Sequence, residues 1–341
     1  MRNEINMAGL TVASGEKVRK MVTVPGTSYE IPVTVINGVE DGKVFFVTAG
    51  VHGLEFPGIQ ATVELSEELE PEEVSGAVVF VPCVNTPAFF KRRAYICPDD
   101  EENRNFNMTF PGKADGTVAQ KVAYFITETI TKHADFHVDI HSGDVVESME
   151  EFCAVCNCED KEMQNFVIEA AKHTSFSHRI ISHGASETYN VSGMKLKVPG
   201  LLFERGGAGI LNWDEVERDK MDLISLMQFL KILPGEPIDN STGQIYYQSH
   251  FWGSAHATGL FYKFVDIGDE VNKGQKMGEI RDFNGNVLEE FFAEFTGRVK
   301  IANNTLGISE GDDTFMYGSV EDATFSSAIP DRFKKALEEE A

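Results

Sequence analysis

The segment Val44–Gly58, VFFVTAGVHGLEFPG, is the most informative part of the sequence. Its first four residues are apolar and predict a buried strand, because a short apolar run bounded by a turn signal is typical of one. The strand ends near Gly50, and His52 and Glu55 follow at once. An imidazole and a carboxylate three residues apart on a turn can reach one metal ion, and zinc accepts both ligand types. Because His-x-x-Glu is short and common, an ordinary surface turn is the alternative interpretation.

Predicted strands and helices alternate around this segment. The strands cover residues 17–24, 29–36, 43–48, 77–82, 135–140, 152–156, 179–181 and 198–204, and the helices cover 56–69, 117–132, 161–173 and 215–233. Residues 89–116 and 182–197 are polar and predict loops; a loop as long as the first is usually functional in a compact enzyme. The alternation indicates an α/β fold with a mainly parallel sheet flanked by helices.

The composition changes after residue 235. Residues 236–244, EPIDNSTGQ, are typical of a linker. From 245 to about 320 the sequence has short apolar runs and many glycines without a helical pattern, which predicts a small all-β domain. We therefore expect a catalytic α/β domain at 1–235, a β domain at 236–325 and a charged tail at 326–341.

Charge and hydropathy exclude several partners. The 341 residues include 30 basic and 54 acidic side chains, a net charge of −24, which repels nucleic acid and anionic membranes. The charge weakly favours cationic small molecules, although solubility is the simpler explanation. No stretch approaches the roughly 18 apolar residues of a membrane span, and the N-terminus MRNEINMAGL lacks an apolar signal-peptide core. We expect a cytoplasmic protein, and the sequence leaves homo-oligomers open.

Cysteine usage favours reduced thiols. Of the five cysteines, Cys153, Cys156 and Cys158 cluster near a predicted strand, and Cys83 and Cys97 are isolated. An odd count without a signal peptide argues against a disulfide framework. A Cys-x-x-Cys pair could bind zinc, but no second pair completes such a site.

Four polar residues follow or close predicted strands. His52 and Glu55 follow one strand, His141 follows a second, and Glu204 closes a third. In open α/β sheets, ligands bind beyond the carboxyl ends of the strands, so these residues should meet at one edge. We expect His52, Glu55 and His141 to hold one zinc ion per chain, with a water molecule activated there. Glu204 would be the general base, with Asp144 or Glu147 as substitutes.

Other polar residues near this edge have weaker claims. Asp139, two residues before His141, is expected on the opposite strand face unless the backbone turns, from where it could still support a ligand imidazole. His133 and His137 have the four-residue spacing that suits zinc on a helix, but they cross a predicted helix–strand boundary. We therefore treat these two as ordinary histidines.

Several motifs together resemble the succinylglutamate desuccinylase/aspartoacylase family of zinc carboxypeptidase-like hydrolases. The resemblance runs from about Val44 to the end of the β domain, and the motifs are His52-Gly53-Leu54-Glu55, Asn105-Phe106-Asn107, Phe110-Pro111-Gly112, Asp139-Ile140-His141 and PGLLFERGG around Glu204. It implies a mixed sheet flanked by helices, a zinc site and a catalytic glutamate at Glu204.

The C-terminal part also carries a motif of that family. Residues 268–275, GDEVNKGQ, resemble the barrel-like C-terminal domain of its deacylase branch. They are similar to lipoyl and biotinyl carrier domains as well, but no modifiable lysine follows in a matching hairpin, so we do not expect a carrier.

One position departs from the family pattern. The resemblance implies Asn-x-Asn-Arg, whose arginine grips a substrate carboxylate, but here Met108 follows Asn107. A thioether cannot make the bidentate contact of a guanidinium. Asn107 stays a candidate substrate contact, and the carbonyl-polarising arginine would be Arg93 or Arg92, with Arg104 as a partial replacement for the lost charge. Each arginine could instead be a solvated loop cation.

The sequence thus predicts a zinc-dependent amidohydrolase that removes an acyl group from a small N-acylated amino acid or amine. A carboxypeptidase-like peptidase is an alternative that the missing arginine at Met108 disfavours. An inactive binding relative is disfavoured by Glu204, because a structural zinc site is closed and needs no base. The sequence does not separate an esterase from an amidase.

Overall fold

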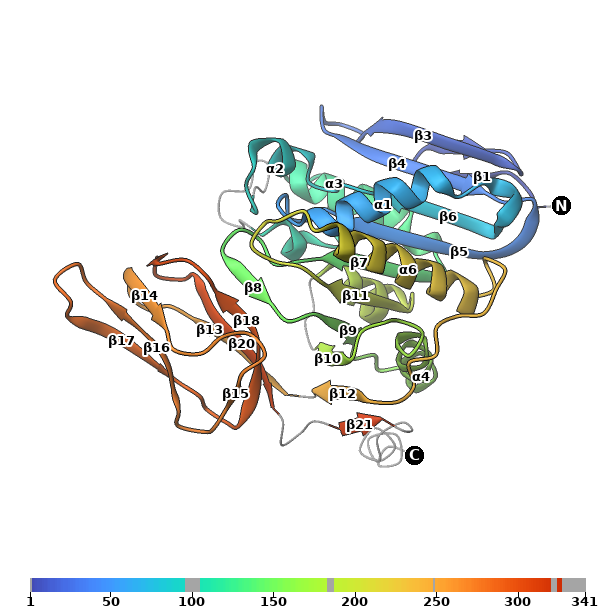
Figure 1. The fold of residues 1–341 in the computed structure, drawn as a ribbon. Helices are drawn as coiled ribbons and strands as arrows, with labels where there is room; N and C mark the ends of the chain where they lie inside the picture. Colours follow the sequence, from blue (N-terminus) through green and yellow to red (C-terminus); the bar gives the residue numbers. More distant parts are fainter. Residues whose placement is uncertain (1, 96–104, 183–186, 248, 320–323, 327–341) are drawn as a thin grey trace.

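The computed structural model describes residues 2–95, 105–182, 187–247, 249–319 and 324–326 (Figure 1). The chain forms a large α/β unit with a smaller unit of antiparallel strands beside it. No helix in these ranges is long and apolar enough to cross a membrane.

A mixed sheet is the centre of the α/β unit. In the described residues its strand order is β21 (Thr324–Ser326), β12 (Gln244–Tyr247), β10 (His178–Ser182), β9 (Phe152–Cys156), β11 (Gly200–Glu204), β7 (Phe136–His141), β5 (Glu40–Ala49), β6 (Ser75–Val81), β4 (Glu30–Asn37) and β3 (Glu16–Thr23). From β11 through β7 and β5 to β6 the pairing is parallel, whereas β11 and β9 are antiparallel. The prediction of a mixed sheet flanked by helices is confirmed, with parallel pairing at its centre.

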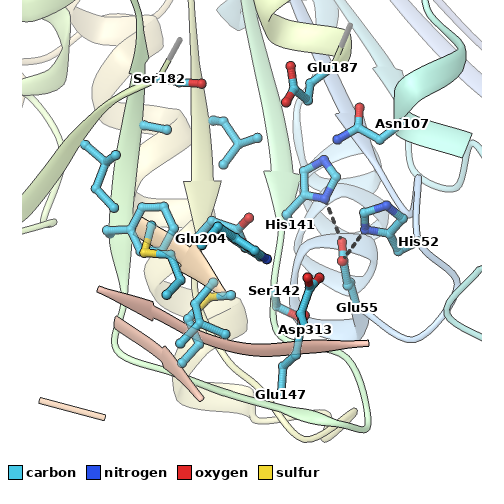
Figure 2. Close-up of a pocket in the computed structure, with 18 of the residues that line it drawn as sticks. His52, Glu55, Asn107, His141, Ser142, Glu147, Ser182, Glu187, Glu204 and Asp313 are labelled. Carbon is cyan, nitrogen blue, oxygen red and sulfur yellow. Dashed lines mark hydrogen bonds and ion pairs between the residues drawn. The ribbon is translucent and has the colours of Figure 1, made fainter. Parts of the chain in front are cut away.

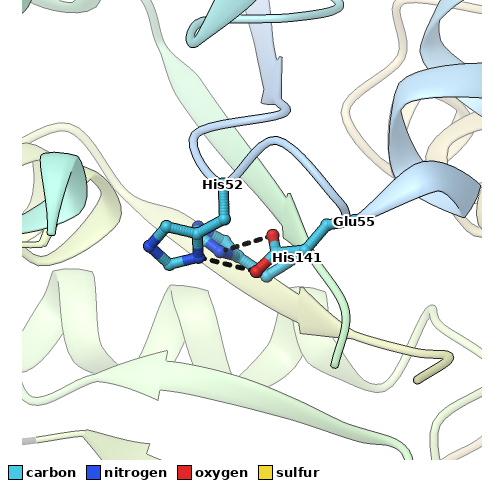
Figure 3. A group of neighbouring side chains, drawn as sticks. All are labelled: His52, Glu55 and His141. Carbon is cyan, nitrogen blue, oxygen red and sulfur yellow. Dashed lines mark hydrogen bonds and ion pairs between the residues drawn. The ribbon is translucent and has the colours of Figure 1, made fainter. Parts of the chain in front are cut away.

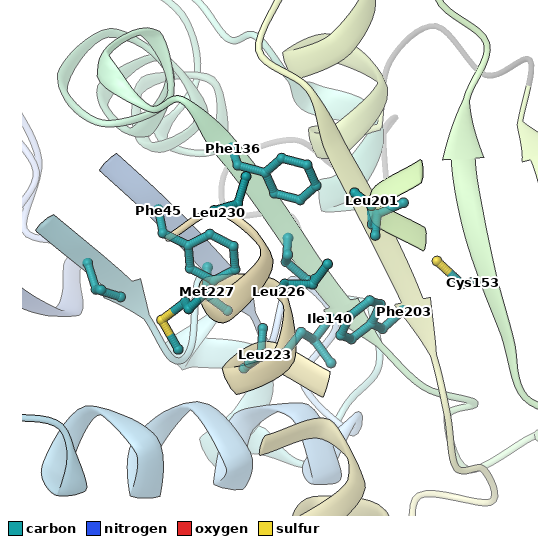
Figure 4. Packing of buried hydrophobic residues seen from close by; sticks show 14 of the residues in the cluster. Phe45, Phe136, Ile140, Cys153, Leu201, Phe203, Leu223, Leu226, Met227 and Leu230 are labelled. Carbon is teal, nitrogen blue, oxygen red and sulfur yellow. The ribbon is translucent and has the colours of Figure 1, made fainter. Parts of the chain in front are cut away.

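Helices cover both faces of this sheet. Three pack on one face: α1 (Phe56–Glu68), α4 (Lys161–Ala171) and α6 (Trp213–Phe229). Their core includes Phe45, Phe136, Phe203 and Leu226, all fully buried (Figure 4). On the other face, α3 (Val118–Thr129) and the hairpin of β1 (Ile5–Met7) and β2 (Leu10–Val12) cover the β4–β6 side. The central strands are thereby buried between packed elements on both faces.

The smaller unit contains two antiparallel sheets around a common core. One has β13 (His250–Ser254), β20 (Asp313–Ser319), β18 (Gly297–Asn303) and β15 (Glu270–Val271), and the other has β17 (Val287–Phe292), β16 (Lys276–Arg281), β14 (Gly259–Lys263) and β19 (Gly307–Ile308). Residues 268–275 include β15 of this unit.

The two units exchange strands across residue 235. β12 and β21 come from the predicted β domain, yet they pair with each other and extend the large sheet beside β10. Conversely, β8 (Glu147–Met149) comes from the catalytic part and pairs with β18. A boundary drawn by composition misses these exchanges, because strand pairing depends on partners far away in the sequence.

Two predicted loops contain helical turns. Residues 182–197 include α5 (Thr188–Asn190) and a π-helical turn, Val191–Lys195. Residues 89–116 include the end of α2 (Thr86–Lys91) and the 3₁₀ turn η2 (Phe106–Thr109). The polar composition of both stretches hid these turns, whose buried Asn107, Thr188 and Ser192 bond to one another or to the backbone.

Candidate active site

His52, Glu55 and His141 meet where two parallel strands end. β5 and β7 are neighbours, so the turn after β5 lies beside the last residue of β7. Glu55 Oε1 is 2.6 Å from His52 Nδ1, and Glu55 Oε2 is 3.0 Å from His141 Nδ1 (Figure 3). The candidate ligand atoms lie within 4.8 Å of one another. The two sequence motifs therefore form one cluster that could hold a metal ion.

The remaining ring nitrogen of each histidine faces a polar partner. His52 Nε2 is 2.9 Å from Asn105 Oδ1, and His141 Nε2 is 3.1 Å from Asp139 Oδ2. Each of these nitrogens can donate to an oxygen, which leaves Nδ1 of both rings as lone-pair donors to a metal. Apart from its 3.0 Å contact with His141 Nδ1, the buried Glu55 Oε2 has no further hydrogen-bond partner among the described residues. This donor set, two imidazoles and a carboxylate with supporting acceptors, fits zinc.

Asp139 lies on the same face of β7 as His141 and contacts its imidazole. Contrary to the expectation from sequence, it shares the strand face of His141, because residues two apart in a strand point the same way. Thr48 donates to its second oxygen at 2.5 Å, and Thr48 is also bonded to His137. His137 is fully buried and stacks on Phe46 with 4.6 Å between ring centroids. His137 is thus an ordinary core histidine, which contacts the site through Thr48.

The charges in the cluster are mutually stabilising. Burial opposes ionisation of Glu55, but His52 and His141 lower its pKa below the usual value. Burial alone would lower the pKa of His141, but Glu55 and Asp139 raise it well above the usual value. Ionised carboxylates are therefore available at neutral pH to balance positive charge at this point.

Glu204 lies beside the triad on the same sheet. The β7–β11 register pairs it directly with His141. Its pKa is raised well above the usual value, first by burial and then by the negative charges of Glu55 and Glu147, although His141 acts in the opposite direction. Glu204 Oε2 makes no hydrogen bond within the described residues. A buried carboxyl with a free oxygen and a raised pKa is suited to taking and returning a proton.

His52, Glu55, His141 and Glu204 line one cavity of about 440 Å³ between the two units (Figure 2). The lining includes further carboxylates, namely Glu147 at the start of β8, Glu187 before α5 and Asp313 at the start of β20. Burial, followed by the charges of Asp144 and Glu55, raises the pKa of Glu147 to about 8. Among the described lining residues there is no lysine or arginine, so a substrate carboxylate has no ammonium or guanidinium partner there.

The predicted substrate contacts have different outcomes. Asn107 and Met108 both line the cavity, and Asn107 Oδ1 accepts two hydrogen bonds from Thr188 at 2.9 Å. Arg92 and Arg93 are exposed after α2 and are not among the lining residues. Arg104 lies outside the described residues. The sites of these three arginines therefore stay predictions.

Arg205, the neighbour of Glu204 in the sequence, has a structural task. It is 1% exposed, and its guanidinium pairs with Asp219 at 2.6 Å, Asp222 at 2.7 Å and Glu151 at 2.9 Å. It also lies over the Phe176 ring, 4.0 Å from its centroid. These contacts hold the turn after β11, and they leave no free face of the cation for a substrate.

Several described residues that line the cavity were assigned no role from the sequence. Tyr95 packs edge-on against His52 with 4.9 Å between ring centroids, and Asn105 orients the same imidazole. Glu187, Trp252 and Asp313 come from segments without a local catalytic pattern. Only the packing of the small unit on the large sheet brings Trp252 and Asp313 to the site.

Comparison with known proteins gives a consistent result. Residues 41–230 match the family model described as the succinylglutamate desuccinylase/aspartoacylase catalytic domain. An N-alpha-acetyl-L-2,4-diaminobutyric acid deacetylase from Halomonas elongata is 29% identical over 298 residues, which cover 85% of this chain and 86% of the relative.

Solved structures share the whole fold. A product-bound ectoine utilization protein from Ruegeria pomeroyi superposes with a TM-score of 0.79 at 24% identity, covering 94% of this chain and 96% of the other. A succinylglutamate desuccinylase/aspartoacylase from Rhodobacter sphaeroides gives 0.78 at 24% identity, covering 93% and 96%. The likeness includes the small β unit, because each match spans nearly the full chain.

Proposed function

The chain belongs to the succinylglutamate desuccinylase/aspartoacylase family, and from this premise we propose that it is a zinc-dependent deacylase acting on a small N-acylated amino acid or amine. One observation carries the proposal: His52, Glu55 and His141 share a single cavity with Glu204. Three protein ligands with an accessible fourth side are typical of catalytic zinc, whereas structural zinc has four protein ligands.

Each residue has a defined task in amide hydrolysis. Zinc, when bound by His52, Glu55 and His141, would supply Lewis acidity and lower the pKa of water. Glu204 would take the proton of the attacking water and return it to the departing amine, which needs a carboxyl whose pKa lies above the usual value. Asp139 and Asn105 would hold the two imidazoles in one tautomer.

The lining favours a substrate without a second carboxylate near Met108. The described lining offers several acids and no lysine or arginine, so N-acetyl-aspartate and N-succinyl-glutamate should be poor substrates. The Halomonas relative is named for an acetylated diamino acid, which agrees with an acidic pocket. We extend this to a preference for neutral or amine-bearing leaving groups.

The test combines metal content with a substrate screen. We expect one zinc per chain by elemental analysis of the purified protein, and amine release from N-acyl amino acids or N-acyl diamines. Release from peptides alone or from esters alone would replace the deacylase assignment with a peptidase or an esterase. A protein without metal and without hydrolysis would contradict the proposal entirely.

A further inference from the structure

An apolar row crosses the large sheet beside the base. Ile180 of β10 pairs with Ala154 of β9, and Ala154 pairs with Leu202 of β11, so the three side chains stand together on one face. All three line the cavity and are at most 6% exposed. One step further along the same strands, Phe152 pairs with Glu204. The floor of the cavity is therefore apolar up to the catalytic carboxyl.

A second apolar row crosses the small sheet. Ile301 of β18 pairs with Met149 of β8 on one side and with Met316 of β20 on the other, and Met316 pairs with Trp252 of β13. These four residues also line the cavity. Ile301 and Met316 belong to the same apolar cluster as Ala154, Ile180 and Leu202. These four residues form the roof of the cavity. As in the floor, the pairing register of the strands brings their side chains together.

The floor row extends from β11 over β9 and β10, on the side of β11 that faces away from the triad strands β7 and β5. Figure 2 shows side chains of carbon and sulfur on the side of Glu204 away from His52, and the carboxylates of Glu187 and Asp313 near the triad. We propose that the floor row Ile180–Ala154–Leu202 and the roof row Met149–Ile301–Met316–Trp252 bind an aliphatic segment of the substrate next to its scissile amide. This inference rests on the proposed deacylase function and names its substrate class.

The aliphatic segment can belong to either side of the amide. It can be the acyl chain, or it can be the side chain of the released amine, and both would fill the same space. We call the space between the floor row and the roof row the chamber. Each methylene group that moves from water into the chamber should raise kcat/KM about fourfold until the chamber is full. A site built for acetyl groups and short polar amines would show no such gradient.

The experiment has two series measured on the zinc-loaded protein. The first varies the acyl group of N-acyl-L-2,4-diaminobutyrate from acetyl to butanoyl to hexanoyl. The second keeps acetyl and varies the amine from L-alanine to L-norvaline to L-norleucine. A gradient in the first series assigns the chamber to the acyl chain, and a gradient in the second assigns it to the amine.

Two substitutions test the location. Ala154→Leu fills the chamber from the floor, and Met316→Phe fills it from the roof. Either should abolish the gradient, which corresponds to a loss on the order of a hundredfold for hexanoyl over acetyl. Ala114→Leu, at an exposed position before α3, is the matched control and should keep the gradient. Thermal unfolding of all three variants identifies any that fail to fold.

The outcomes separate the two proposals. Hydrolysis of the acetyl compounds with no gradient in either series would overturn the aliphatic chamber and leave the deacylase function intact. A gradient that survives in both folded filling variants would also overturn it. If no compound is hydrolysed, the proposed function fails first. Calorimetry with hexanoate and hexylamine then tests the chamber alone, and binding of neither would overturn it.

Discussion

The triad end and the apolar end of the cavity are built in different ways. At the triad end, the ligands follow adjacent parallel strands of one sheet, and buried partners such as Asp139 and Asn105 fix them. At the apolar end, the walls come from two sheets, and residues such as Ala154 and Met316 meet only because the small unit packs on the large one. The candidate metal ligands thus lie on or just after the central strands of the large sheet. The residues proposed to select the substrate lie at the contact between the two units, which we call the seam.

The largest expected effect tests the triad end. We expect His52→Ala combined with His141→Ala to remove zinc and to lower amide hydrolysis by at least about a thousandfold, because several kcal/mol of charge stabilisation are lost. Elemental analysis and kcat/KM measure both. The matched control is His133→Ala with His256→Ala, two exposed histidines outside the cluster. Full zinc occupancy in the triad variant would contradict the ligand assignment.

Glu204, the proposed base, lies between the two ends of the cavity. Glu204→Gln should keep zinc and fold but lower kcat by roughly a hundredfold to ten-thousandfold, the usual range for a general acid–base group. Glu147→Gln, which changes another carboxyl of the same cavity, should cost much less. If Glu147→Gln lowered kcat more than Glu204→Gln did, Glu147 of β8 would be the general base instead of Glu204 of β11.

A smaller effect is expected at the cavity wall near Asn107. Met108, 46% exposed, occupies the position where the family resemblance implies an arginine. Met108→Arg should raise kcat/KM for N-acetyl-aspartate and N-succinyl-glutamate by about tenfold or more, because a charge-assisted contact is gained. Met221→Arg on exposed α6 controls for added charge. Efficient turnover of either compound by the unchanged protein would show that Met108 does not face the substrate carboxylate.

The smallest effect concerns the seam. Glu150, between β8 and β9, pairs with Arg298 at 2.5 Å and Lys300 at 2.7 Å on β18. Burial opposes ionisation of Glu150, but these two cations lower its pKa to about 2. Because the folded pKa is depressed, its stabilising contribution is present above about 4.5 and is lost as the pH falls through about 2.

Glu150→Gln should therefore lower the free energy of unfolding by about 1–3 kcal/mol at neutral pH. The difference from the unchanged protein should narrow as the pH falls below about 4.5, measured by denaturant unfolding. Glu67→Gln breaks an exposed pair with Arg19 and should cost less than about 1 kcal/mol. Equal losses in the free energy of unfolding in both variants would mean that the Glu150 ion pairs contribute no more than an exposed surface pair.

The contrast between the two ends also explains what could be predicted. Glu55 and His141 could be found from sequence, since a polar residue directly after an apolar strand points to the edge where ligands bind. The chamber could not, because Ala154 and Ile301 look like ordinary core residues until the register between distant strands is known. Residues 245–247 of β12 were expected in the β domain, and their pairing with β10 of the large sheet was missed for the same reason. The buried helical turns at Asn107 and Thr188 were predicted as loops because both stretches are polar, although the two residues bond to each other.

The pairing of β12 with β21 has a consequence for how the roof is attached. The small unit leaves the large sheet after β12 and returns at β21, its direct neighbour, so it is in effect the tip of one very long hairpin. Both tethers enter the sheet at a common edge, and the roof is presented to the floor at a high effective concentration within one chain. Because β8 also pairs with β18, the small unit is held to the large one at a second place, and the contact between roof and floor does not depend on protein concentration.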